Sequence, residues 1–142
     1  MTKLSINIDV DDLENGVAFY SAAAGLTPVS RFGDSAVELA GAEVPIYLLR
    51  KPPSRPPFPG ATAKRDYARH WTPVHVDFIV DDLNQALDRA VRAGARSEAP
   101  TESFGWGRMV LLSDPFGNGF CLIELDAAGY KAMSTPYAPP PA

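Results

Sequence analysis

The chain opens on a run of alternating apolar and polar residues, and a similar run returns near its middle. Side chains alternate between the two faces of a β-strand, so each run predicts a strand with one apolar face. We expect these strands over residues 4–10 and 74–80. The apolar faces should pack on helices, which turns the polar faces toward solvent or, with two such sheets in one chain, toward a shared hollow. The polar faces carry Ser5, Asn7 and Asp9 in the first strand and His75 and Asp77 in the second.

Each opening strand leads into two aspartates and then into apolar residues at helical spacing. The second aspartate of each pair is Asp12 in the first copy and Asp82 in the second. Its carboxylate can accept hydrogen bonds from the free N–H groups of a first helical turn. Gly25 and Gly94 are natural helix ends, because glycine readily adopts the left-handed conformation that closes a helix. The repeated signals predict one helix before Gly25 and another before Gly94.

Three further strands are expected after each helix, where short apolar runs alternate with turn residues. They are predicted over residues 26–31, 36–40 and 44–50 in the first copy and over 95–101, 108–113 and 118–125 in the second. Five of the ten residues at 51–60 are proline, which predicts an extended spacer between the copies. The chain therefore divides into a first unit at residues 1–50, a proline-rich linker at 51–70, a second unit at 71–126 and a tail at 127–142.

The composition is that of a globular domain, with 142 residues of which 46% are hydrophobic and 21% charged. The net charge of −4 argues against a nucleic-acid partner, which would need clustered basic residues. The densest basic group, Lys64, Arg65 and Arg69, falls in the linker, where we interpret it and the neighbouring His70 as solvated. No apolar run reaches the ~20 residues that span a bilayer, so no membrane partner is expected. The single cysteine, Cys121, excludes an internal disulfide and, with no apolar leader, makes the cytoplasm the expected location.

Four motifs carry a resemblance to a known family. They are Val10-Asp11-Asp12-Leu13 with Ala18-Phe19-Tyr20, the stretch from His75 to Leu83, Ala93-Gly94-Ala95, and Asp114-Pro115-Phe116-Gly117-Asn118. In this order they resemble the vicinal oxygen chelate superfamily, which includes glyoxalase I, extradiol dioxygenases, fosfomycin-resistance proteins and bleomycin-binding proteins. The resemblance implies an α+β fold in which two βαβββ repeats form a curved mixed-sheet cup. It also implies a homodimer, because family members commonly dimerise.

The resemblance indicates where a metal centre would lie, since metal-dependent members take ligands from the first and last strands of each unit. The equivalent positions here are Ser5, Tyr47, His75 and Cys121, and only His75 is a residue type that these proteins use. His75 and Cys121 alone would hold a soft metal at two points, which seldom suffices. We therefore expect no metal or other cofactor, with a divalent metal at this pair as the remaining alternative. Glu124 should lie on the opposite strand face, and Cys121 is otherwise a small buried apolar side chain.

The candidate ligand-binding residues come from these strands and from one aromatic loop. Beside Asp77, His75 can act as a hydrogen-bond donor or as a general base, although a histidine on a strand is as often purely structural. Trp106, in the glycine-containing loop 104–107, can either close on a ligand or pack over the sheet edge. The full candidate set is Ser5, Asn7, Asp9, Tyr47, His75, Asp77, Trp106 and Cys121.

Three functions are compatible with these features. The first is a metal-free protein that binds a small cationic or aromatic molecule in the cup, in contact with Asp9, Asp77 and Trp106. The second is a lyase, isomerase or dioxygenase of the same superfamily that uses His75 with an altered or metal-independent site. The third is an interaction module whose cup is filled by its own side chains or by a second subunit, with a domain-swapped pairing as one arrangement. No phosphate-binding loop, serine elbow or zinc-protease motif occurs.

Overall fold

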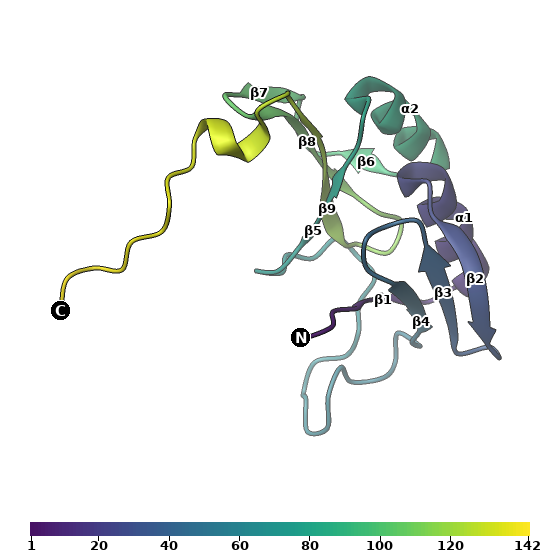
Figure 1. Ribbon diagram of the computed structural model, residues 1–142. Coiled ribbons are helices and arrows are strands. Elements are labelled where there is room, and N and C mark those ends of the chain that lie inside the picture. The colour runs from purple at the N-terminus through teal and green to yellow at the C-terminus, as the bar shows by residue number, and fades with distance from the viewer.

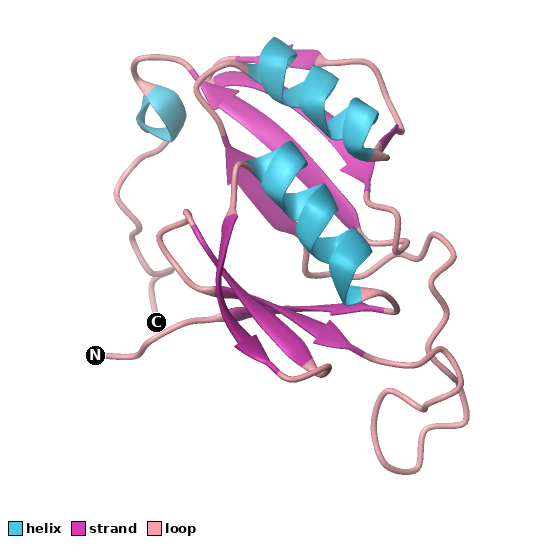
Figure 2. Ribbon diagram, turned by 90° about the vertical axis from the view of Figure 1, so that its right-hand side faces the viewer, coloured by secondary structure: helices cyan, strands magenta, loops and turns pink.

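The fold consists of two β-sheets, each covered on one face by a helix (Figure 1, Figure 2). The computed structural model describes residues 1–142. The first half contains β1 (Ile6–Val10), α1 (Leu13–Ala24), β2 (Thr27–Phe32), β3 (Ala36–Ala40) and β4 (Ile46–Arg50). The second contains β5 (Val76–Ile79), α2 (Leu83–Ala93), β6 (Arg96–Ser97), β7 (Glu102–Phe104), β8 (Gly107–Ser113) and β9 (Gly119–Leu125). The helices lie side by side and the sheets form a curved cup, so the expected α+β class is confirmed.

Within each sheet the first and last strands of the unit are neighbours and run parallel. The strand orders are β1-β4-β3-β2 and β5-β9-β8-β6, with β7 also pairing with β8. This order places Asn7 opposite Tyr47 in the first sheet. It places Asp77 opposite Cys121 in the second. Residues far apart in the sequence therefore become neighbours at the same place in each sheet.

Both helices begin and end as the sequence predicts. The Oδ1 atom of each capping aspartate accepts the N–H of the residue three positions later, at 3.0 Å for Asp12 and 2.9 Å for Asp82. Gly25 and Gly94 close the helices with φ angles of 67° and 113°. These angles suit glycine, which has no Cβ to clash in the left-handed region.

The core lies between each sheet and its helix. Ile8 and Val10 on β1 and Phe120 on β9 are among its buried residues, so the expectation that the apolar strand faces pack on helices is confirmed. Leu4 and Val74 were expected on the same faces, but both precede their strands and are exposed. β1 begins at Ile6, whose N–H bonds to the Pro45 carbonyl, because Pro45 has no N–H with which to extend the ladder back toward Leu4.

A buried hydrogen bond joins the two halves. The Tyr20 hydroxyl on α1 donates to Oδ2 of Asp114 in the β8–β9 turn at 2.5 Å. The same carboxylate accepts the backbone N–H groups of Phe116 and Asn118, each at 2.8 Å. Burial and the nearby Asp114 charge raise the pKa of Tyr20 well above its usual value. The tyrosine therefore remains a donor and holds α1 against the second half.

The strand predicted over residues 95–101 is wrong as a single element. It is divided into β6 and β7, and residues 98–101 lie between them outside any strand. Pro100 has no N–H to donate to β8, and proline inside a paired strand removes a ladder hydrogen bond. The remaining strands agree with the prediction to within two residues.

The segment that runs from β4 to His75, residues 51–74, is called the strap. It is not the solvated linker that we expected from the sequence. Arg65 donates through Nε to Oδ2 of Asp9 on β1 at 2.7 Å, and its side chain is only 17% exposed. Arg69 forms an ion pair with Glu98 of the second half. His70 is bonded through both its backbone and its ring to the β8–β9 turn. Only Lys64 of the basic group is solvated as expected.

The C-terminal tail packs on the second sheet and then leaves it. A short 3-10 helix, Gly129–Ala132, brings Tyr130 against Trp106, with ring centroids 5.2 Å apart. Residues 134–142 are exposed and run away from both sheets (Figure 1).

None of the helices has both the length and the apolar character that crossing a membrane would require.

Candidate functional site

A cavity of about 860 Å³ lies where the two sheets meet. Its walls come from β1, β5, the start of β9 and the strap. Asn7 and His75 both line it, so the polar faces of the two opening strands do contribute to one hollow. The shared hollow predicted from the strand alternation is therefore present only in part. Ser5 and Asp77 of the polar faces do not line the cavity, whereas Ile8 and Phe78 of the apolar faces do, and the strap supplies much of the wall.

The cavity has an aromatic lining drawn from four segments. Tyr20 on α1, Phe78 on β5 and Phe120 on β9 form one wall, with ring centroids of Phe78 lying 6.3 Å from Tyr20 and 6.0 Å from Phe120. Tyr67 and Trp71 line it from the strap. Tyr67 is anchored because its hydroxyl donates to the Lys51 carbonyl at 2.6 Å. Aromatic walls with few polar groups are typical of small-molecule sites.

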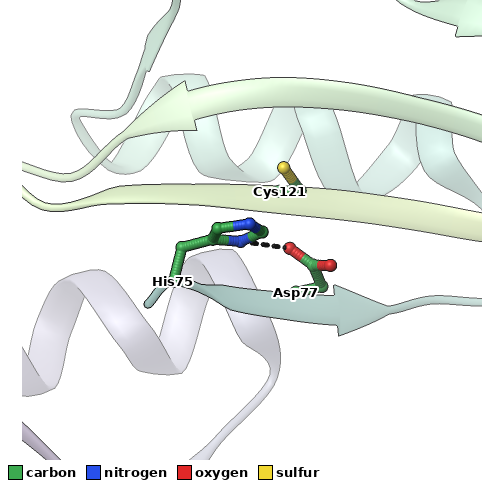
Figure 3. Close-up of side chains that lie close together, drawn as sticks. All are labelled: His75, Asp77 and Cys121. Carbon is green, nitrogen blue, oxygen red and sulfur yellow. Dashed lines mark hydrogen bonds and ion pairs between the residues drawn. The ribbon is translucent and has the colours of Figure 1, made fainter. Parts of the chain in front are cut away.

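His75, which lines the cavity, projects from the same face of the second sheet as Asp77 and Cys121, which do not line it (Figure 3). Nδ1 of His75 lies 2.8 Å from Oδ1 of Asp77. A carboxylate only accepts hydrogen bonds, so this contact places the imidazole proton on Nδ1 and leaves Nε2 as the basic atom. The arrangement can orient an imidazole for hydrogen bonding or for proton transfer.

Cys121 is 5% exposed and lies opposite Asp77 in the pairing of β5 with β9. Burial, reinforced by the Asp77 carboxylate, raises the pKa of its thiol from 9.0 to about 11. A thiol with this pKa stays protonated near neutral pH and is a poor nucleophile. The prediction of a small buried side chain thus agrees with the structure, but the thiol lies beside two polar groups rather than in an apolar setting.

The remaining predicted site residues lie apart from this cluster. Asp9 lines the cavity, yet its carboxylate is occupied by Arg65. Ser5 is exposed just before β1, and Tyr47 packs near Phe32, with ring centroids 6.2 Å apart; neither lines the cavity.

Trp106 also lies outside the cavity lining. It is stacked on Phe104 with ring centroids 4.8 Å apart and 3° between the ring planes. Of the two alternatives for this residue, the structure therefore shows packing at the sheet edge.

The sequence interpretation missed the strap as a source of site residues. Arg65, Tyr67 and His70 all line the cavity. The available signal was the density of basic and aromatic residues between positions 64 and 71, which an idle spacer does not need.

The four positions that the family uses for its metal centre do not fit that centre in this chain. Ser5 and Tyr47 offer hydroxyl groups, which bind divalent ions poorly, and no carboxylate of the first sheet joins His75 and Cys121 in a metal-binding group. Glu124 cannot help, because it lies on the helix-facing side, where it accepts the Leu83 N–H at 2.8 Å. That bond and the Arg108 guanidinium lower the pKa of Glu124. The only metal-binding side chains that gather in the structure are His75, Asp77 and Cys121.

Comparisons with known proteins agree with this architecture. Residues 5–123 match the sequence model of a family described as the glyoxalase-like domain. A genomically encoded fosfomycin resistance protein from Listeria monocytogenes superposes with a TM-score of 0.66 at 17% identity, over 89% of this chain and 96% of that chain. A lactoylglutathione lyase from Agrobacterium tumefaciens gives 0.59 at 20% identity, over 87% and 92%. An antibiotic binding protein from a Streptomyces species gives 0.62 at 22% identity, over 89% and 97%.

At such identities the likeness to solved structures shows the fold alone. No curated protein sequence matches the chain.

Proposed function

We propose that this chain, which belongs to the glyoxalase-like family, binds a small molecule with an aromatic group in the cavity between β1 and β5, without the full metal centre of that family. The observation that carries the proposal is the cavity of about 860 Å³ with both Asn7 and His75 on its wall. This volume lies within the range of roughly 300–1,000 Å³ found for small-molecule sites. A fosfomycin resistance protein and an antibiotic binding protein share the fold, which is consistent with a binding role.

The polar groups of the cavity favour a neutral ligand over a cationic one. The carboxylate of Asp9 is neutralised by Arg65, and the charge of the exposed Asp66 is balanced by Lys64, which also lines the cavity, so no net negative charge remains for a cation. The Asn7 amide remains to donate to a carbonyl or ring nitrogen of the ligand, and the unprotonated Nε2 of His75 remains to accept from a hydroxyl or N–H group. The aromatic side chains would then pack against the apolar body.

The two tryptophans provide a matched test. Trp71 lines the cavity and Trp106 does not, so Trp106→Phe leaves a reporter inside the site and Trp71→Phe leaves one outside it. A panel of neutral, anionic and cationic aromatic compounds is titrated into both variants and into the wild type. We expect a saturable change in fluorescence only where Trp71 is present, with a rise in the melting temperature of the wild type. Equal responses of the two variants, or no response to any compound, would count against the proposal.

A second candidate function is acid–base catalysis on a bound molecule by His75, as in a lyase or isomerase. It is favoured by one observation, the 2.8 Å contact with Asp77 that leaves Nε2 of His75 free to take a proton. In D₂O, NMR would follow hydrogen exchange next to a carbonyl in any compound that the binding screen identifies. A positioned base contributes about 10²–10⁴-fold, so His75→Gln should slow the exchange by that factor. Exchange that is equally fast with His75→Gln would exclude this role.

The homodimer and the cytoplasmic location stay predictions. Light scattering of the purified chain tests the first.

A further inference from the structure

His70 holds the strap against the second half of the chain through one backbone contact and two ring contacts. Its backbone N–H donates to the Gly117 carbonyl at 3.1 Å. In the ring, Nδ1 lies 3.0 Å from the Ala68 carbonyl oxygen and Nε2 lies 3.0 Å from Oδ1 of Asn118. We propose that His70 is a proton-operated latch, which holds the strap on the β8–β9 turn in acid and loosens as the pH rises. The latch needs no cavity ligand, so it stands apart from the proposed binding function.

Neither oxygen that faces the His70 ring can donate a hydrogen bond to it. The Ala68 carbonyl only accepts. The Asn118 amide is fixed in its orientation, because its Nδ2 donates to Oδ2 of Asp114 at 2.9 Å. The Asp114 carboxylate is itself held by the Tyr20 hydroxyl and by two backbone N–H groups. Both ring nitrogens of His70 therefore face acceptors.

The number of protons on the imidazole decides how many of these ring contacts are hydrogen bonds. A neutral imidazole has one N–H and one lone pair, so it can donate to Ala68 or to Asn118 but not to both. An imidazolium donates to both oxygens, and hydrogen bonds from a charged donor are the stronger ones. Histidine ordinarily gains this second proton between about pH 8 and pH 5. Since the closed strap favours the proton, the latch contributes its stability in acid and loses it as the pH rises.

The latch acts on a wall of the cavity. Tyr67, His70 and Asn118 all line it. The strap contains no helix or strand, so a small number of contacts determine its position. It packs closely on the turn, because a Cβ at Gly117 would overlap the Ala68 carbonyl oxygen. Loss of one ring contact thus loosens the wall where the strap meets the second half.

The charged groups around His70 leave the direction of this effect unchanged. They are Asp66 and Arg69 on the strap and Glu98 and Asp114 on the second half. The positive charge of Arg69 is balanced by its ion pair with Glu98. Carboxylates and guanidinium groups ordinarily keep their charges between about pH 5.5 and pH 7.5, so the side chains that change charge in this interval are the histidines.

Amide hydrogen exchange followed by NMR tests the latch without a ligand. The reporter is the backbone N–H of residue 70, which bonds to the Gly117 carbonyl. Its protection factor, the intrinsic exchange rate divided by the observed rate, removes the pH dependence of the chemistry itself. We expect protection to be at least about tenfold higher near pH 5.5 than near pH 7.5, the size of one hydrogen bond from a charged group. In His70→Gln the protection should not change over this interval.

His75→Gln is the matched control, because His75 is the other of the two histidines and lies on the approach to β5. It should keep the full pH dependence. Asn118→Ala removes the acceptor at Nε2, so a neutral imidazole can then satisfy its remaining contact and the dependence should shrink, although His70 still titrates.

A measurement on the wild type completes the test and needs no variant to fold. Long-range ¹H–¹⁵N correlation spectra in acid should show a proton on each ring nitrogen of His70, both slow to exchange with solvent. Four results would overturn the proposal: equal protection at the two pH values, a dependence that survives His70→Gln, an undiminished dependence in Asn118→Ala, or ring protons that exchange freely with solvent.

Discussion

The parallel pairs β1–β4 and β5–β9 have the same register but carry different chemistry. Where the first sheet places Asn7 opposite Tyr47, the second places Asp77 opposite Cys121, with His75 two residues before. The second sheet therefore contains every titratable group of the candidate cluster. The first sheet contributes a cavity wall and an amide. The repeat thus provides the same backbone arrangement twice, and the function of each copy depends on the side chains that it carries.

The acidic residues of the two opening strands also differ in their partners. Asp9 on β1 is held by Arg65 from the strap. Asp77 on β5 is turned toward His75 and Cys121, without a basic residue that neutralises it permanently. Only the second carboxylate remains available to orient a base or to bind an ion. The predictions below test how far the two halves depend on each other and how far they differ.

The largest effect is expected at Asp114, where the halves are joined. Asp114→Ala leaves the Tyr20 hydroxyl and the Phe116 and Asn118 N–H groups without their buried acceptor. We expect the free energy of unfolding to fall by about 3 kcal/mol, as for other buried polar networks. Urea denaturation measures it, and a loss below about 1 kcal/mol would contradict the role of this contact.

Tyr20→Phe is the control that removes only the bond between the halves. It should cost less than Asp114→Ala, because the two backbone donors keep their acceptor. The pKa of Tyr20 is raised above its usual value of 10.0 in the folded chain. Its contribution to stability is therefore fully present below pH 10.0 and is lost as the pH rises further, so the phenylalanine variant should lose less stability at alkaline pH.

The second prediction compares equivalent helix positions, Gly16 on α1 and Ala86 on α2. Ala86 is fully buried, so Ala86→Gly removes a packed methyl group and lowers helix propensity. We expect a loss of about 1–2 kcal/mol. A Cβ at Gly16 would lie 3.0 Å from Cδ1 of Leu48 and 3.2 Å from Cγ1 of Val10. Both neighbours are buried, so Gly16→Ala should also destabilise, and a gain of stability in thermal denaturation would show that the first half is packed less tightly.

The helices and most strands could be predicted from the sequence because their signals are local. The capping aspartates, the glycine stops and the period of two each depend on residues within a few positions. The placement of His75 and Cys121 on one sheet depended on the resemblance, which supplied the strand order that a single sequence does not contain.

The strap could not be predicted in the same way. The Arg65–Asp9 pair joins residues 56 positions apart, through a segment without regular structure whose path no periodicity describes. The same reason applies to the contact of Trp106 with Tyr130, which depends on where the tail folds back. Pro100 is different, since its presence in the sequence was sufficient to argue against an unbroken strand.

The third prediction concerns the strap and the first sheet. A double-mutant cycle with Arg65→Ala and Asp9→Ala should give a coupling energy of about 1 kcal/mol, since the Arg65 side chain is mostly buried but Asp9 is partly solvated. Arg65→Ala alone also frees the Asp9 carboxylate inside the cavity. Its binding preference should then move toward cationic aromatic compounds, measured by the same fluorescence titration. An unchanged preference would mean that Asp9 does not influence the ligand.

The smallest effect is expected where β4 and β9 differ at equivalent positions, Arg50 and Glu124. Glu124 accepts the N–H of Leu83, the first residue of α2, and the N-terminal end of a helix is a favourable place for a negative charge. That hydrogen bond and the Arg108 side chain lower the pKa of Glu124. Its stabilising effect is therefore present above pH 4.5, the usual value, and is lost as the pH falls through the lowered pKa. Glu124→Gln should be less stable than the wild type at neutral pH, and the difference should shrink in acid.

Arg50→Gln, the matched change on the first sheet, should show no such acid dependence, because the exposed Arg50 side chain has no equivalent bond to α1. Urea denaturation between neutral and acid pH compares the two variants, and parallel profiles would mean that Glu124 does not cap α2 in solution.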